Sequence, residues 1–280
     1  MQFDGLIFDI GMFDGIDTRY FLKNNYKVIA VEADPSLVKK ASETFKEAID
    51  KDQLSILNFA LSDQDDQDLS FNISEYAFWN SLKPEVAGRL DTFKESIIVK
   101  SRKLSTLFAQ YGVPLYCKVD IEGFDAICVS TLEGTKLQPK YISVETECIG
   151  ENEVLDEAGM LKTLDTLKAI GYNQFKLVDQ TTLAVLELDK PFYGGTWDKL
   201  NRLKNKYFHY NFVRDHKNGV KYNLFYTGAS GAFGESLGGS KWYNYEEAKK
   251  LLLQHREQYF NLYKNQNKNF TFWCDWHAKL

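Results

Sequence analysis

Carboxylates in and after one apolar segment are the residues of this sequence best suited to chemistry. Lys118, Asp120 and Glu122 alternate in the run Lys-Val-Asp-Ile-Glu-Gly, at the end of the apolar segment 116–121. Side chains alternate along a strand, so these three are expected on one face. Charged groups are rarely buried without a partner. This face is therefore predicted to meet a substrate, with Asp120 and Glu122 as proton acceptors. The alternative is a structural pair between Lys118 and a carboxylate.

A glycine turn between two apolar segments is the second chemical signature. Gly11 and Gly15 follow the segment 6–10, and Glu32 follows the segment 27–31. The glycines allow a tight turn and a close approach of the backbone to a ligand. Glu32 is placed to accept hydrogen bonds from the hydroxyls of a ribose. Together these residues predict a nucleotide-type site.

The spacing of the glycines indicates which nucleotide binds. The pattern is D-x-G-x-x-x-G beginning at Asp9, and it lacks the middle glycine, at position 13, of the dinucleotide pattern G-x-G-x-x-G. Such a turn suits a ligand without phosphate, such as S-adenosylmethionine (SAM). Asp9 is expected either to anchor the glycine loop or to meet the ammonium group of the ligand.

Two further pairs of residues are candidates for acceptor binding or catalysis. Glu145 and Glu147 stand at the end of the apolar segment 141–146, where they would contact acceptor hydroxyls or remain solvated. Asp275 and His277 alternate in the last segment and are expected on one face. A histidine with a pKa near neutrality can act as a general base, so His277 is the third candidate for that role; a surface histidine without function is the alternative.

The order of apolar and amphipathic segments predicts an α/β fold, in which a parallel sheet carries helices on both faces. Residues 1–150 form the expected cofactor-binding core. Residues 151–280 are expected to complete the sheet and to supply acceptor-binding and lid elements within one continuous domain; the glycine-rich loop 227–241 is the predicted lid. The predicted strands are 6–10, 27–31, 54–61, 69–73, 97–100, 116–121, 141–146, 175–178 and 183–186, and the predicted helices are 18–24, one beginning at Asp34-Pro35, 104–111, 125–132, 156–170 and one capped by Asn244.

Composition excludes several classes of partner. The 280 residues carry a net charge of −5, which argues against general nucleic-acid binding. The four cysteines form no C-x-x-C pair, so a zinc site is not expected. No apolar run is long enough to span a membrane and no leader pattern opens the chain. A cytoplasmic location without a membrane partner is the expectation, and the oligomeric state stays open.

Five motifs in this order resemble the FkbM family of SAM-dependent methyltransferases, over roughly residues 5–147. They are Asp9-x-Gly11-x-x-x-Gly15, Val31-Glu32-Ala33-Asp34-Pro35, Ala60-Leu61-Ser62-Asp63, Trp79-Asn80-Ser81-Leu82 and Lys118-Val119-Asp120-Ile121-Glu122-Gly123. The tail looks like that of a bacterial subgroup. The resemblance implies a Rossmann-like class I fold with a seven-stranded, mostly parallel sheet and an elaborated C-terminal region. It also implies SAM at Asp9, Gly11, Gly15, Glu32 and Ala33, with the adenine near Ala60, Leu61 and Asp63.

The expected reaction is O-methylation of a hydroxyl group on a sugar, a glycan or a small natural product. Trp79, Asn80 and Ser81 are expected to shape the choice of acceptor, with Lys118, Glu145, Glu147 and Asp275 as further contacts. A metal bridging Asp120 and Glu122 would be another route to activate the hydroxyl, but no metal is predicted. Two alternatives are an NAD-dependent oxidoreductase and a non-catalytic module that binds SAM or a glycan.

Overall fold

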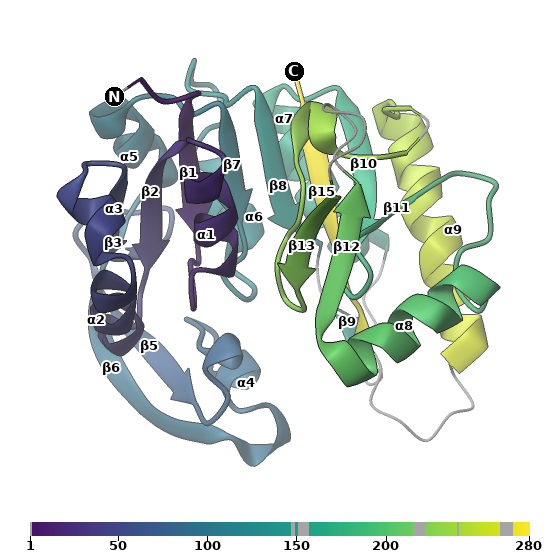
Figure 1. The fold of residues 1–280 in the computed structure, drawn as a ribbon, viewed down its shortest axis with the longest axis horizontal. Helices are drawn as coiled ribbons and strands as arrows, with labels where there is room; N and C mark the ends of the chain where they lie inside the picture. The colour runs from purple at the N-terminus through teal and green to yellow at the C-terminus, as the bar shows by residue number, and fades with distance from the viewer. Residues whose placement is uncertain (1, 147–148, 151–156, 215–221, 240, 264–270) are drawn as a thin grey trace. The chain divides into compact units, whose positions relative to one another are not determined.

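The computed structural model describes residues 2–146, 149–150, 157–214, 222–239, 241–263 and 271–280. It divides into two compact units, Met1–Ile142 and Ser143–Leu280. The strand β8 (Tyr141–Glu145) begins in the first unit and ends in the second. Figure 1 labels the helices and strands of both units.

The largest sheet has eight described strands, one more than the seven that the family resemblance implies, in the order β11-β10-β15-β8-β7-β1-β2-β3. The edge strand β11, predicted from the sequence as 183–186, pairs antiparallel with β10. Strand β1 pairs in parallel with β7 and with β2, β2 pairs in parallel with β3, and β10 pairs antiparallel with β15. Besides β8, the strands of this sheet are β1 (Leu6–Ile10), β2 (Lys27–Glu32), β3 (Leu54–Asn58), β7 (Tyr116–Val119), β10 (Gln174–Asp179), β11 (Ala184–Leu186) and β15 (Cys274–Lys279).

Helices α1 (Ile16–Lys23) and α5 (Leu104–Tyr111) cover opposite faces of β1 in the first unit. Phe8 makes an edge contact with Phe108 of α5, at 4.8 Å between ring centroids. The next residue, Asp9, accepts a hydrogen bond from Thr18 of α1 at 2.5 Å. Since consecutive side chains of a strand point to opposite faces, the predicted two-sided cover of the sheet is confirmed here.

Two helices of the first unit begin in different ways, one with a side-chain cap and one without. Helix α2 (Pro35–Thr44) begins as predicted, because the Asp34 side chain accepts a hydrogen bond from the Ser36 N–H. Helix α1 begins two residues before the predicted start. Its N-cap is Gly15 in the left-handed conformation, φ 78°, with no side-chain cap. The other helices here are α3 (Lys46–Asp50) and α6 (Asp125–Ser130).

The predicted strand 54–61 is two strands that belong to different sheets. Its last residues form β4 (Ala60–Leu61), which pairs with β6 (Phe93–Arg102) in a three-stranded sheet with β5 (Asp68–Ser74). Ala60 packs in a small core with Phe71 and Val99. The connection from β5 to β6 contains η1 (Ala77–Trp79), α4 (Pro84–Ala87) and η2 (Arg89–Asp91).

The second unit packs long helices against the antiparallel strands. Helix α9 (Tyr245–Tyr263) begins with the predicted capping box, in which Asn244 and Glu247 exchange backbone-to-side-chain hydrogen bonds of 3.0 and 3.1 Å. Tyr245 of α9 also donates a hydrogen bond to Asp165 of α7 (Glu157–Ile170) at 2.5 Å. None of the described helices is both long and apolar enough to cross a membrane.

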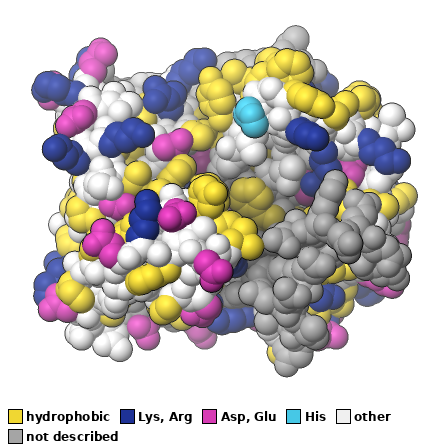
Figure 2. All heavy atoms as spheres, turned by 90° about the horizontal axis from the view of Figure 1, so that it is seen from below, with side chains coloured by type: hydrophobic (Ala, Val, Ile, Leu, Met, Phe, Trp, Pro, Cys, Tyr) yellow, Lys and Arg dark blue, Asp and Glu magenta, His cyan; other side chains and the backbone are white. Residues whose placement is uncertain are grey.

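The remaining elements of the second unit include a segment with few sequence signals. It forms α8 (Thr196–Phe208) and the hairpin of β12 (Tyr210–Arg214) and β13 (Tyr222–Tyr226). The two-stranded pair of β9 (Ile149–Gly150) and β14 (Thr271–Phe272) and the turn η3 (Gly234–Ser236) complete the unit. Some large hydrophobic side chains remain at the surface of the molecule (Figure 2).

The described part of the glycine-rich loop, residues 227–239 and 241, does not have the character of a mobile lid. Ala229, Ala232 and Phe233 are buried. A Cβ on Gly239 would lie 2.6 Å from Val185, so the glycine permits close packing beside β11. The loop is therefore packed on the sheet of its own unit, which argues against the predicted closing movement.

Candidate functional site

Lys118 of β7 is a buried cation between two carboxylates of the first unit. Its Nζ lies 3.6 Å from Asp9 and 3.6 Å from Asp120, and it donates a hydrogen bond of 2.8 Å to the Gly11 carbonyl. The structural pairing left open by the sequence is therefore present. Its charge offsets the two neighbouring acids, and its buried side chain leaves little surface for the predicted contact with an acceptor.

Asp9 anchors the glycine loop and has no exposed surface. It bonds Thr18 and lies beside Lys118; burial raises the pKa of its carboxyl, although both partners oppose this. A side chain without accessible surface cannot contact a cofactor, so the predicted direct contact is replaced by the anchoring role. The buried pair with Lys118 accounts for this acid in an otherwise apolar strand.

The backbone at the end of β7 explains why position 11 is a glycine. Its φ is 75°, and a Cβ there would lie 1.8 Å from the Asp120 carbonyl oxygen. At Gly15, where φ is 78°, a Cβ would lie 2.5 Å from the Phe45 ring. The turn predicted from both glycines is confirmed. The close approach was expected to be to a ligand, and the structure shows it to be to atoms of Asp120 and Phe45. Close packing holds the glycine loop against the residues that follow β7.

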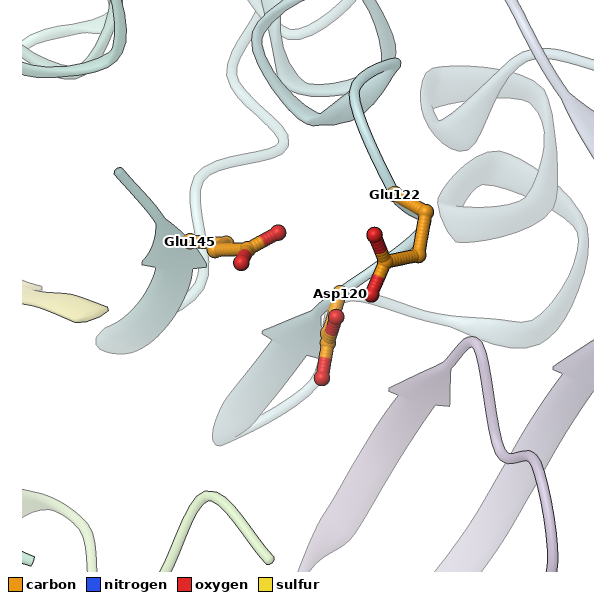
Figure 3. Close-up of side chains that lie close together, drawn as sticks. All are labelled: Asp120, Glu122 and Glu145. Carbon is orange, nitrogen blue, oxygen red and sulfur yellow. The ribbon is translucent and has the colours of Figure 1, made fainter. Parts of the chain in front are cut away.

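The loop after β7 concentrates negative charge. Figure 3 shows the side chains of Asp120 at the end of the strand and of Glu122 two residues later; Glu145, also labelled there, ends β8 in the second unit. Glu122 has a φ of 54°, so the predicted strand alternation stops at Val119. The carboxylate of Asp125 accepts hydrogen bonds from the N–H groups of Ile121 and Gly123 at 2.9 and 3.0 Å, which fixes this strained turn.

Crowding of these acids changes their protonation. Burial, together with the charges of Asp120 and Asp125, raises the pKa of Glu122 to about 8, although Arg89 at 3.6 Å opposes the rise. Burial and Asp120 raise the pKa of Asp125 to about 6. Near pH 7 the Glu122 carboxyl is therefore largely protonated in the free protein, and a positively charged ligand bound beside it would favour its ionised form.

This shift predicts a dependence of stability on pH. Glu122 holds its proton more tightly in the folded than in the unfolded chain, so stability is lost as pH rises from about 4.5 through about 8. Glu122→Gln removes the charge, and it should raise the free energy of unfolding by roughly 2 kcal/mol near pH 9 and by much less near pH 5. Urea titrations of both proteins at the two pH values measure this.

The exposed Glu133 supplies the control for that measurement. Glu133→Gln is expected to leave the free energy of unfolding within about 0.5 kcal/mol of wild type at both pH values. A stabilisation by Glu122→Gln of equal size at both pH values would contradict a raised pKa for Glu122.

Glu32 connects the glycine loop to the start of α2. Its two carboxylate oxygens accept hydrogen bonds of 2.9 Å from the N–H groups of Phe13 and Asp34. Burial raises the pKa of this carboxyl, and the backbone N–H groups lower it in part. Each carboxylate oxygen has a second acceptor position, so these bonds leave acceptor capacity for a ribose. The carboxylate is thereby held at the end of β2.

Asn80 and Ser81 tie the β5–β6 insertion to both loops. The Asn80 amide donates to Asp34 at 3.0 Å, and the Ser81 hydroxyl donates to the Glu122 carbonyl at 2.7 Å. Both side chains are buried. They were predicted to contact the acceptor, and the structure instead uses them to position the residues that flank the candidate site. Trp79 is partly exposed and lies against Tyr76 and Phe78, with ring centroids 5.4 and 5.3 Å apart.

The region predicted to meet adenine is mostly core. The side chains of Ala60 and Leu61 are buried, and Ala33 packs against the core cluster that contains Ala60. Because the side chains of Ala60 and Leu61 are buried, contact with a base is left to their backbone atoms. Asp63 is exposed and stays a prediction.

The candidates of the second unit lie in a buried setting. His277 is buried, and burial and the charge of Lys176, its partner in the sheet, lower its pKa to about 3. A base with a pKa near neutrality was expected, and this environment contradicts that. Asp275 and Glu145 are also buried rather than solvated. Glu147 lies outside the described residues.

Arg89 and Asp125 contact the acidic loop of the candidate site, and sequence reasoning assigned them no part in it. Arg89 lies in the β5–β6 insertion, thirty-three positions before Glu122 in the chain, and no local sequence pattern predicts their contact. Asp125 did carry a signal, since it stands two residues after Gly123 at a helix start. Asn58, which donates to the carbonyls of Glu32 and Ala33 at 2.9 and 3.0 Å, supports the same region.

The strand order and the acids at the carboxyl ends of β2 and β7 define a Rossmann-like fold of the class I methyltransferase type. The sequence matches the family described as "Methyltransferase FkbM domain" over residues 9–173. That match covers more than half of the chain, and the chain belongs to the FkbM family of methyltransferases.

Solved structures give distant similarities. The FkbM methyltransferase of Methylobacillus flagellatus KT is 13% identical with a TM-score of 0.38, over 63% of this chain and 41% of that one. This chain thus spans well under two thirds of its length. The precorrin-6y C5,15-methyltransferase of Geobacter metallireducens GS-15 is 11% identical, TM-score 0.35, over 64% and 68% of the two chains. Coclaurine N-methyltransferase bound to N-methylheliamine and SAH is 12% identical, TM-score 0.35, over 99% and 67%. The search of curated proteins found no match.

Proposed function

We propose that this chain transfers a methyl group from SAM to a hydroxyl group of a sugar, a glycan or a small natural product. The observation that carries the proposal is the acidic loop after β7, where the pKa of Glu122 rises to about 8. A proton acceptor works best when its pKa lies near the working pH. Family membership supplies the methyltransferase class, and the acidic loop supplies the chemistry expected for an alcohol acceptor.

The residues of the first unit fit SAM as the cofactor. SAM carries a positive sulfonium and supplies an electrophilic methyl group. The carboxyls of Asp120, Glu122 and Asp125 interact with one another, and a cation bound beside them would favour the ionised form of Glu122. Glu32, with acceptor capacity left at each oxygen, is the residue proposed to hold the ribose hydroxyls.

The proposed role of the acidic loop is to take the proton of the acceptor hydroxyl as oxygen becomes a nucleophile. Lys118 lies 3.6 Å from Asp120 and holds that carboxylate beside the glycine loop. Glu122 has a different environment and a raised pKa. Glu122 is the proposed base, because its raised pKa lies near a working pH close to neutrality. Asp120 is proposed to orient the acceptor hydroxyl, and it is the second candidate for the base.

Aromatic side chains next to the positioning residues are proposed to bind the acceptor. Tyr76 and Phe78 are stacked at 5.6 Å and about half exposed, and Trp79 meets both of them edge-on. Trp79 directly precedes Asn80, which is bonded to Asp34. Large flat apolar faces beside a polar site are typical of pockets for small organic ligands, and they suit the apolar face of a sugar ring.

Assays with SAM and a panel of hydroxylated acceptors test this function. Wild type is expected to form one methyl ether for each S-adenosylhomocysteine released. Trp79→Ala should raise the KM for that acceptor about tenfold with little change in the Kd of SAM, because it removes apolar contact with the acceptor alone. Tyr111→Ala, at an aromatic residue of α5, is the control.

The outcomes of these assays separate the alternatives. Tight SAM binding without turnover on any acceptor would favour the non-catalytic module. A methylated nitrogen or carbon in the product would contradict the proposed hydroxyl. An unchanged KM in Trp79→Ala would remove the aromatic residues from the acceptor site. The cytoplasmic location stays a prediction.

A further inference from the structure

The outward face of α8 in the second unit is apolar. Trp197, Leu200, Leu203, Tyr207 and Phe208 are all more than half exposed, Trp197 at 76%. The first four follow one another at three or four residues, which places them along one side of the helix, and Phe208 ends the helix next to Tyr207. Among the described residues, eight of the seventeen exposed large hydrophobic side chains lie in α8 and the β12–β13 hairpin. Single exposed hydrophobic residues are ordinary, but a cluster of this size indicates a binding surface.

The inward face of the same helix is polar, which reverses the usual arrangement. Asp198 and Asn205 are buried. Arg202 lies between Asp198 and Asp179 of β10, at 2.5 and 3.1 Å. Asn205 also donates a hydrogen bond to the Thr181 carbonyl. This buried network fixes the orientation of α8, so the apolar side cannot turn inward without breaking ion pairs.

The β12–β13 hairpin likewise exposes apolar side chains and buries polar ones. Phe212 and Leu224 are directly opposite each other and exposed. Asn211 and Asn223, on the other face, are buried. Ring contacts join the helix to the hairpin, from Phe208 to Tyr210 at 5.9 Å and from Tyr210 to Phe212 at 5.1 Å. Helix and hairpin therefore form one continuous apolar surface, which we call the α8–hairpin surface (α8, β12 and β13 in Figure 1).

Lysine side chains accompany this surface. Lys199, Lys204 and Lys206 lie on α8, and Lys204 lies 5.9 Å from the centre of the Phe212 ring. The only acidic residue of the helix, Asp198, forms an ion pair with Arg202. The chain as a whole has a net charge of −5, so this basic segment differs in sign from the rest. An anionic partner would be attracted to this surface and repelled by the acidic remainder, which orients the encounter.

We propose that the α8–hairpin surface binds an anionic lipid surface, with α8 lying in the plane of the interface. Tryptophan, tyrosine, phenylalanine and leucine on one side of a helix, with lysines beside them, are typical of such interfacial helices. A two-fold contact between copies of this chain fits less well, because it would bring the same lysines together without a described acid to pair them. This proposal departs from the expectation of no membrane partner and does not depend on the methyltransferase chemistry.

Flotation of the full chain with vesicles tests the proposal. Wild type is expected to float with vesicles of phosphatidylcholine and phosphatidylglycerol at low salt and to bind phosphatidylcholine alone much less. Trp197→Ser with Leu200→Ser should lower the binding constant about tenfold or more, through lost burial of two large apolar side chains. Lys199→Glu with Lys206→Glu should weaken binding to the anionic vesicles alone. The control pair, Ile98→Ser with Leu280→Ser, changes equally exposed residues elsewhere and should bind as wild type.

Three results would overturn the proposal. The first is absence of wild-type protein from the floated fraction with anionic vesicles at low salt. The second is an equal loss of binding in the control pair. The third is a wild-type dimer by light scattering that Trp197→Ser with Leu200→Ser converts to a monomer, without any vesicle binding; a second copy would then be the occupant of the surface. Circular dichroism melting of each variant confirms that the folded protein is compared.

Discussion

Asp120→Asn and Glu122→Gln are each expected to lower the kcat of methyl transfer by about 10²–10⁴-fold, the usual contribution of a positioned acid or base. Both substitutions keep the shape of the side chain and remove its ability to accept a proton. Asp120→Asn also leaves Lys118 with one carboxylate neighbour fewer. Since neither residue is assigned to the ribose, the Kd of SAM should change only a few-fold. Single-turnover rates with saturating SAM measure the effect.

The pH dependence distinguishes the roles of the two carboxyls. The wild-type rate should rise with pH along a limb governed by Glu122, whose pKa in the free protein is raised to about 8. A bound cation would move that limb to lower pH. Glu122→Gln should remove the limb, and the surface control Glu133→Gln should keep it. If both carboxamide variants retain wild-type kcat on the true acceptor, these acids are not the base.

Glu32→Ala is expected to weaken SAM binding about 100-fold, since hydrogen bonds to a charged acceptor contribute roughly 1.5–3 kcal/mol each. The same change leaves the N–H groups of Phe13 and Asp34 without their acceptors. A loss of about 2–4 kcal/mol in the free energy of unfolding should accompany it, if both groups stay buried. Calorimetric titration and urea unfolding measure the two effects separately.

Asn58→Ala is the matched control for that variant. Asn58 donates to the carbonyls of Glu32 and Ala33, so its removal loosens the end of β2 and leaves the carboxylate in place. Its SAM affinity should fall far less than that of Glu32→Ala at comparable stability. Equal losses of affinity in both variants would mean that Glu32 acts through the fold alone.

Local signals in the sequence predicted much of the fold. The Asp34-Pro35 start of α2 and the Asn244–Glu247 capping box involve residues within a few positions of each other, and both are confirmed. The apolar segments of β1 and β2 likewise define buried parallel strands. The separate sheet of β4 depends on pairing with β6, about forty residues later in the chain, and local patterns do not specify such a pairing.

The acidic residues of the candidate site could be predicted from the sequence, whereas the hydrogen bonds that position them could not. Asn80 and Ser81 were read as acceptor contacts, and their bonds to Asp34 and to the Glu122 carbonyl are long-range contacts that no spacing reveals. His277 was read by residue type, and its burial beside Lys176 makes it a weak base. The burial of a side chain depends on which elements pack over it. The alternation of residues along a single strand does not identify those elements.

Helix α8 shows a third limit of periodicity. Its apolar residues recur at helical spacing, which by itself suggests that they face a core. The ion pairs of Arg202 with Asp179 and Asp198 turn the polar side inward instead. Which face of an amphipathic helix is buried is thus decided by its partners in the fold.

The central claim is that the first unit binds SAM with Glu32 and the acidic loop after β7. Calorimetric titration of the full chain with SAM and, separately, with NAD tests it most directly. The account predicts one SAM bound per chain, an affinity that falls in Glu32→Ala, and no heat of binding with NAD. Saturable binding of NAD with no binding of SAM would contradict it.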